Sequence, residues 1–133
     1  MISQLRRNQG GFTLVEIMIV VAIIGLLAAI AVPSFLRARM RAQASTILNE
    51  CRQVDAAKDQ YALETNKSGT ATPSWNDLTP WIKAGTRLAD NGGADTLGNS
   101  FIIGDIQSRL QVHTATKSSL STAADNAFWG PYS

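Results

Sequence analysis

The sequence has little of what stabilises or charges many small proteins. Its 133 residues include one cysteine, four prolines and a net charge of only +2. A single cysteine cannot form a disulfide within the chain, so no disulfide framework supports the fold. Twelve Lys and Arg residues against ten Asp and Glu residues are too even a balance to indicate nucleic acid or a strongly anionic partner. We therefore expect no nucleic-acid contact.

Sequence patterns of catalysis are also absent. The chain has no phosphate-binding loop, zinc-ligand spacing or nucleophile motif. Its one histidine, His113, has no Cys, Ser or carboxylate motif beside it, and we expect it at the surface or edge of a strand. Cys51 is expected to be a small buried residue on a helix. The sequence predicts no enzymatic activity for this chain.

What the chain does have is a long apolar run without charge, from Ile17 to Leu36. Twenty helical residues span about 30 Å, which is the thickness of the hydrocarbon core of a bilayer. Basic residues flank the run, with Arg6 and Arg7 before it and three arginines after it, at 37, 39 and 41. Such flanks are typical of membrane topology signals.

Two ordinary interpretations of this run remain open. A secretory signal peptide would use Arg6 and Arg7 as its basic region and Ala29-Ile30-Ala31 as its cleavage site. A simple anchor helix would keep the run in the membrane. Either one would make the chain a secreted or membrane-anchored monomeric binding domain. Neither explains why Glu16 abuts the run or why two glycines precede it.

A third interpretation comes from a family resemblance. The stretch that begins GGFTLVEIMIVVAIIG resembles, over residues 10–36, the N-terminus of type IV prepilins and of type II secretion pseudopilins. The resemblance implies a leader, residues 1–11, that prepilin peptidase removes by cutting between Gly11 and Phe12. The same enzyme would then N-methylate Phe12. Glu16 would be the family's acidic residue, which pairs with the N-terminal amine of a neighbouring subunit during assembly.

Physical chemistry agrees that Glu16 needs a partner. An ionised carboxylate in hydrocarbon costs several kcal/mol even after relaxation. Cutting after Gly11 would create a suitable cation, the α-amine of Phe12, four residues before Glu16 on the same helix. The alternative is that Glu16 only reaches up to the lipid headgroups.

The apolar run continues into an amphipathic helix. Residues 34–65 contain neither Gly nor Pro, which predicts one helix over 12–65. Its first half, 12–36, would form the membrane span and filament core, and its second half, 37–65, would pack on the rest of the chain. Pro33, with Gly25 as a further weak point, predicts a kink. Asn66 or a following Gly would cap the helix end. A buried stripe is expected from the helical spacing of Met40, Ala44, Ile47, Cys51, Val54, Ala57 and Tyr61, and the opposite, polar face from Arg37, Arg41, Arg52, Asp55 and Asp59.

Residues 66–133 would form a small head. The expected class is α+β and pilin-like, with the long N-terminal α-helix packed on a small C-terminal antiparallel β-sheet. Two short strands are expected at 100–106 and 109–114. A short helix should start after Ser74, in a capping box with Asp77, and break or restart at Pro80. Another short helix is expected within 117–127, and the aromatic residues of 128–133 should pack on the sheet or the long helix.

The loop 89–99 raises the question of calcium. Asp90, Asn91 and Asp95 offer the oxygen ligands that Ca²⁺ takes. Their spacing matches no defined calcium loop, and turn-forming Asp and Asn explain them without a metal. They are weak candidates, and no other cofactor is expected. Many pilins clamp the C-terminal region with a disulfide, which this chain cannot form, so the head resembles that of a pseudopilin or minor pilin.

The resemblance therefore predicts a structural subunit of a type IV pilus-like or type II secretion pseudopilus filament. It implies an inner-membrane single-pass protein with its head in the periplasm, which then enters a cell-surface pilus or a periplasmic pseudopilus. The implied partners are further copies of the chain, prepilin peptidase, and the pilus or secretion assembly machinery. The sequence does not choose between pilus, pseudopilus and DNA-uptake filament.

Overall fold

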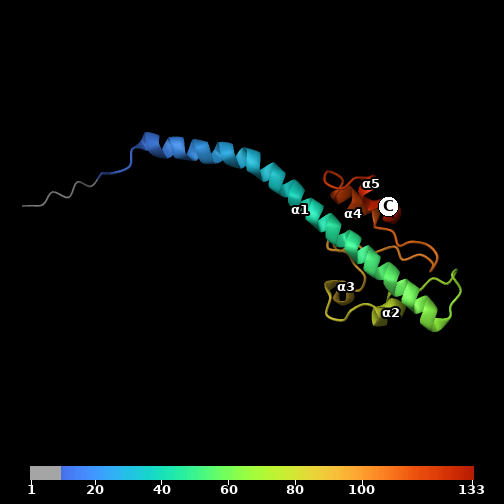
Figure 1. Ribbon diagram of the computed structural model, residues 1–133. Helices are drawn as coiled ribbons and strands as arrows, with labels where there is room; N and C mark the ends of the chain where they lie inside the picture. Colours follow the sequence, from blue (N-terminus) through green and yellow to red (C-terminus); the bar gives the residue numbers. More distant parts are fainter. Residues whose placement is uncertain (1–9) are drawn as a thin grey trace, which may run out of the picture. The chain divides into compact units, whose positions relative to one another are not determined.

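The computed structural model describes residues 10–133, so most of the predicted leader, 1–11, lies outside the described residues. Helix α1 runs from Leu14 to Thr65, 52 residues without interruption, as Figure 1 shows. The predicted long helix is thereby confirmed. Two compact units divide between Phe35 and Leu36, and each is described by itself.

The first unit consists of the apolar part of α1. All the large apolar side chains from Phe12 to Leu36 are exposed, with exposed fractions between 48% and 87%. The helix contains an 18-residue window of mean hydropathy 2.9 and, by length and composition, is able to cross a membrane. Pro33 lies inside it, and the expected kink there stays a prediction. An apolar surface of this size needs lipid or another protein to cover it.

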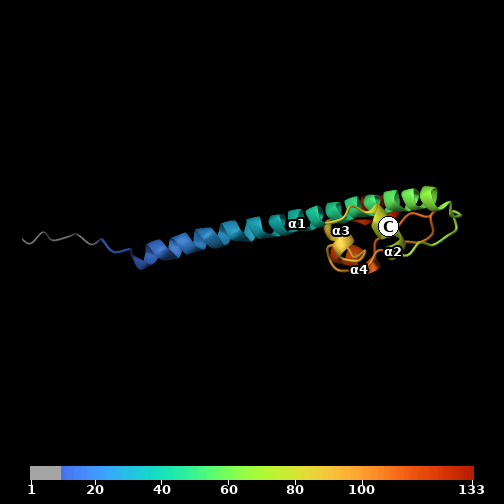
Figure 2. The same cartoon turned by 90° about the horizontal axis from the view of Figure 1, so that it is seen from below.

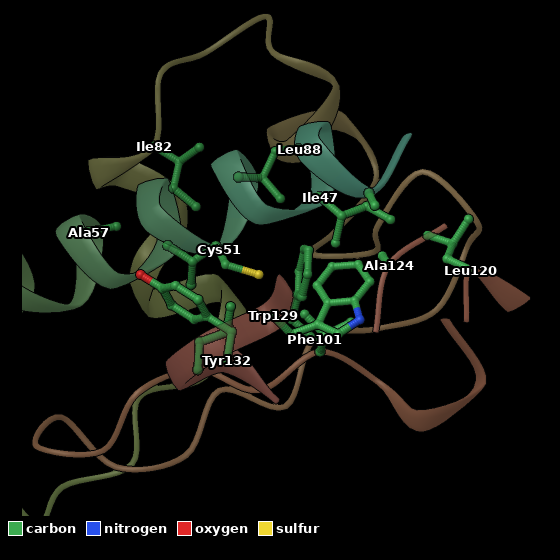
Figure 3. Packing of buried hydrophobic residues seen from close by; sticks show 14 of the residues in the cluster. Ile47, Cys51, Ala57, Ile82, Leu88, Phe101, Leu120, Ala124, Trp129 and Tyr132 are labelled. Atoms are coloured by element: carbon green, nitrogen blue, oxygen red, sulfur yellow. The ribbon is translucent and has the colours of Figure 1, made fainter. Parts of the chain in front are cut away.

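The second unit packs its head on the predicted stripe of α1. Ala44, Ile47, Cys51, Val54 and Ala57 are at most 1% exposed, so the middle of the stripe and the burial of Cys51 are confirmed. Met40 and Tyr61, at the two ends of the predicted stripe, are half-buried and pack against this core. Figure 3 shows Ile47 and Cys51 in one cluster with Trp129 and Tyr132. The C-terminal aromatic residues therefore pack against the long helix, as expected. Burial also raises the pKa of the Cys51 thiol.

Short helices make up the regular structure of the head. The short helices that Figure 2 labels lie along the C-terminal part of α1. Asn66, with a φ of 49°, leaves α1 in the left-handed conformation expected of its cap. The helix expected after Ser74 is present, with the Ser74 N–H donating to the Asp77 carboxylate at 2.8 Å. The elements are α2 (Trp75–Leu78), η1 (Thr79–Trp81), α3 (Arg87–Asp90), α4 (Thr114–Ser119), α5 (Asn126–Trp129) and η2 (Gly130–Tyr132).

The prediction of an antiparallel sheet is wrong, because residues 10–133 contain no β-strand. Two isolated antiparallel bridges stand in its place, Ala94 to Ser100 and Ile102 to Gln111. The bridges do not extend into a ladder, and polar side chains of α1 bind other backbone groups of the same segment.

Two α1 side chains carry this role. The Lys58 ammonium donates to the carbonyl oxygens of Ile103, at 2.9 Å, and Ser108, at 2.5 Å. Asp55 accepts from the Leu110 N–H at 3.2 Å. Both expected strands and the turn between them are thus bound to the helix. Burial lowers the pKa of Lys58.

Two further expectations are corrected. His113 is no strand residue: it caps α4, and its Nδ1 accepts from the Ala115 N–H at 3.1 Å, so that helix begins before the predicted range 117–127. Asp55 and Arg41 do not lie on a face turned away from the head. The Arg41 guanidinium donates to the Ala123 carbonyl at 2.7 Å and lies 4.4 Å from the centre of the Phe128 ring.

Lys58→Met is expected to lower the free energy of unfolding by about 3 kcal/mol, because two charge-assisted hydrogen bonds are lost. Methionine fills a similar volume, so packing changes little. The measurement is chemical unfolding of the full chain in detergent, followed by the fluorescence of the three tryptophans, all of which lie in the head. The exposed Lys67 gives the matched control, Lys67→Met. Equal stability of the two variants would contradict this role for Lys58.

Candidate functional site

The start of α1 is closed by a reciprocal pair of side chains, Thr13 and Glu16. The Thr13 N–H and hydroxyl both donate to Glu16 Oε2, at 2.9 and 3.2 Å. In return, the Glu16 N–H donates to the Thr13 hydroxyl oxygen at 3.2 Å. This geometry is a capping box, which satisfies backbone donors that the first helical turn leaves free.

Sequence analysis singled out Glu16 and missed Thr13. The pattern was readable, because Ser or Thr three residues before Asp or Glu, ahead of an apolar run, indicates a capping box. The uncut chain thus already holds the Glu16 carboxylate at the helix N-terminus, where the helix dipole also favours a negative charge. Among residues 10–133, both bonds to the carboxylate reach Oε2, which leaves Oε1 for a partner outside the chain.

The predicted cleavage point lies immediately before this capping box. Gly11 and Phe12 are exposed and precede the first helical residue, Leu14. The Phe12 side chain is 87% exposed, and open space surrounds the position that a side chain at residue 11 would occupy. A peptidase needs such accessible backbone outside regular structure. In the uncut chain the Phe12 nitrogen is part of a peptide bond, so the predicted pairing of Glu16 with an amine requires cleavage.

The candidate calcium residues are not brought together into a site. Asp95 is buried, and its carboxylate accepts from the N–H groups of Leu97 and Asn99, at 2.9 and 3.0 Å, and from the Thr116 hydroxyl. Asp90 is exposed at the end of α3. Within the described part of the chain, no three His, Cys, Asp or Glu side chains are grouped to hold a metal ion. Asp95 therefore ties the loop to α4, and calcium binding there stays a prediction.

Comparison with known proteins identifies relatives of this N-terminal segment. A family model described as the prokaryotic N-terminal methylation motif matches residues 6–32. The type IV major fimbrial protein FimA of Dichelobacter nodosus is 34% identical over 120 residues, which cover 90% of this chain and 73% of that protein. No solved structure matches.

Shorter matches extend to secretion and pilus proteins. The type II secretion system core protein G of Pseudomonas aeruginosa is 42% identical over 59 residues, covering 44% of this chain and 42% of that protein. The type IV major pilin protein PilA of Myxococcus xanthus is 38% identical over 82 residues, covering 56% of this chain and 37% of that protein. Two other FimA matches span 43% and 55% of those relatives, so the chain spans about half the length of several relatives. Because the match to the first FimA runs through α1 and most of the head, this chain belongs to the type IV pilin and pseudopilin family.

Proposed function

We propose that this chain is a structural subunit of a type IV pilus-like or type II secretion pseudopilus filament, polymerised through the first half of α1. The single observation that carries the proposal is the continuous apolar surface from Phe12 to Leu36, exposed along its whole length. Cleavage ahead of this surface retains it in the mature protein. It then lies in the inner membrane before assembly and against the same helices of neighbouring copies afterwards.

Exposure of this surface to water would be costly, which keeps it either in the membrane or in the filament core. Fully burying one large apolar side chain contributes roughly 1.5–3 kcal/mol relative to water, and sixteen of them are exposed from Phe12 to Leu36. Lipid already covers these apolar side chains before assembly. A polar contact between subunits is therefore needed as well, to set the direction in which the filament grows. The pair formed by Glu16 and the Phe12 amine of a neighbouring subunit supplies it.

The remaining parts of the proposal follow from this arrangement. Prepilin peptidase, acting on the cytoplasmic side, would place residues 1–11 in the cytoplasm and the head in the periplasm. Assembly would then carry the head to the cell surface in a pilus, or keep it periplasmic in a pseudopilus. No catalytic activity and no cofactor are part of the proposal, because its relatives are structural proteins and packing explains the polar groups of the head.

The N-terminus of the mature protein tests the proposal. The chain purified from membranes that contain prepilin peptidase should have the mass of residues 12–133 plus one methyl group, with N-methyl-Phe12 as the first residue. Top-down mass spectrometry measures both. A product that begins after Ala31 would indicate a secreted protein, and an uncut chain would indicate a simple anchor. Either result would overturn the proposal.

A further inference from the structure

The exposed side of α1 carries two opposite charges, on Arg52 and on Asp59, which lies at the edge of a pocket that head residues 106–109 also line. Both side chains are exposed. They are seven residues apart, and seven helical residues make almost two full turns and a rise of about 10 Å. Arg52 and Asp59 therefore lie on one face of the helix, one above the other, two turns apart.

Neither side chain forms an ion pair within the described part of the chain, although the charge of Asp59 acts on the pKa of Lys58 against the lowering that burial causes. The ion pairs among residues 10–133 join Lys58 to Asp55, Arg87 to Glu50 and Arg109 to Asp55. The acid three residues from Arg52, Asp55, already accepts from the Leu110 N–H and lies 3.6 Å from Arg109. Arg52 and Asp59 are themselves too far apart to pair, because side chains on one helix meet at a spacing of three or four residues.

A second copy of the chain, displaced along the helix axis, can supply each of these two charges with an oppositely charged partner. We propose that Arg52 of one subunit pairs with Asp59 of the next subunit across the exposed face of α1, and that this pair sets the axial register of neighbouring subunits. The proposal rests on the proposed filament function, and the partner is a second copy of this chain. In a filament whose heads lie outside, this face of every α1 turns towards the filament axis and its neighbours.

The displacement agrees in direction with the predicted contact at the helix start. Copies in a filament are related by one screw operation, so every residue moves by the same rise along the filament axis. Where α1 runs along that axis, a copy shifted towards its C-terminal end by four residues, about 6 Å, brings its Phe12 amine level with Glu16 of its neighbour. The same shift moves its Arg52 towards Asp59 of the neighbour. The long, flexible arginine side chain spans the remaining difference of about 4 Å.

The other exposed arginines of α1 offer no such match. At a shift of four to seven residues, Arg37 and Arg39 face positions 41–46 of the neighbour, where there is no acidic residue. Arg41 is bound to the Ala123 carbonyl and the Phe128 ring of its own head. Arg52 and Asp59 therefore carry the register. Because exposed ion pairs are individually weak, the pair selects the stagger while apolar burial supplies most of the affinity.

Site-directed crosslinking tests the register. Filaments sheared from cells that produce Arg52→Cys/Asp59→Cys chains are treated with a short bismaleimide, because an ion pair does not bring main chains within disulfide distance. The native Cys51 is buried and does not compete. We expect a ladder of covalent multimers at whole-number multiples of the subunit mass. The matched control is Arg52→Cys/Leu63→Cys: Leu63 is 83% exposed on the same face but lies about 6 Å beyond Asp59 along the helix, and a clearly weaker ladder is expected.

Intact filaments without a ladder, equal ladders in both variants, or adducts with a different protein would each overturn the register. If the cysteine variants do not assemble, exchanging the charges of Arg52 and Asp59 tests the register instead. Arg52→Glu and Asp59→Arg should each reduce the sheared filament fraction by at least about threefold, and the double exchange should restore it. Failure of the double exchange would overturn the pairing. Absence of filaments from the unaltered chain would instead count against the proposed function.

Discussion

Glu16→Val is expected to leave cleavage and methylation at Phe12 unchanged and to abolish filaments. Valine suits the apolar surroundings of α1, so membrane insertion should not suffer. What the variant loses is the carboxylate that, in the proposed mechanism, meets the N-terminal amine of the neighbouring subunit. The measurement combines the mass of the mature chain with electron microscopy of sheared filaments, and we expect a mature monomer confined to the membrane.

The capping box gives this experiment its controls. Glu16→Gln keeps the pattern of a capping box, which accepts Gln in place of Glu, but removes the charge. Thr13→Ala keeps the charge and loses the cap, at a cost of about 1 kcal/mol to the helix end. If the charge of Glu16 drives assembly, Glu16→Gln fails and Thr13→Ala assembles. Normal filaments from Glu16→Val would show that assembly needs neither the charge nor the cap. Failure of Thr13→Ala with normal assembly of Glu16→Gln would show that Glu16 acts only as a helix cap.

Gly11→Leu is expected to block processing and leave a precursor heavier than the mature chain by residues 1–11. A peptidase that grips extended backbone next to the scissile bond tolerates glycine because it has no side chain. The space around residue 11 in the structure is open, so leucine should disturb the enzyme's contact and not the fold of the chain. Intact mass spectrometry of membrane fractions distinguishes the two forms.

The adjacent glycine supplies the matched control. Gly10 is equally open but lies one residue further from the proposed scissile bond, so Gly10→Leu should be processed to the same mature mass as the unaltered chain. Because the uncut precursor has no amine at Phe12, Gly11→Leu should also yield no filaments. A mature product of normal mass from Gly11→Leu would place the cleavage elsewhere and remove the basis of the Glu16 pairing.

The long helix and its buried stripe were predictable because both are local properties of the sequence. Helical periodicity alone placed Ala44, Ile47 and Cys51 on one face, and the structure buries all three. The absence of Gly and Pro over 34–65 likewise predicted an unbroken helix up to Thr65. The capping box of Thr13 and Glu16 is equally local, since its members are three residues apart, and its pattern was readable from the sequence.

The head was harder to predict because its partners are distant in the sequence. Residues 100–114 alternate like strands, but their backbone groups meet Asp55 and Lys58, between 45 and 55 residues away. No local pattern shows that two charged residues of a helix will bind a loop in this way. For the same reason, nothing in the sequence around Glu50 indicated that this residue is buried beside Arg87. The desolvation that burial causes raises the pKa of Glu50.

The sequence by itself determined that the chain has an exposed apolar helix with an acid at its start and an amphipathic continuation, because spacing along one helix settles which residues share a face. Only the tertiary structure decided that the head is a set of short helices and bound loops in place of a sheet. The physical reason is that each backbone N–H and C=O takes whichever partner the fold brings near. For residues 101–112 those partners are distant backbone groups of the head, such as those of Gly69, Gly93 and Tyr132, together with the side chains of Asp55 and Lys58.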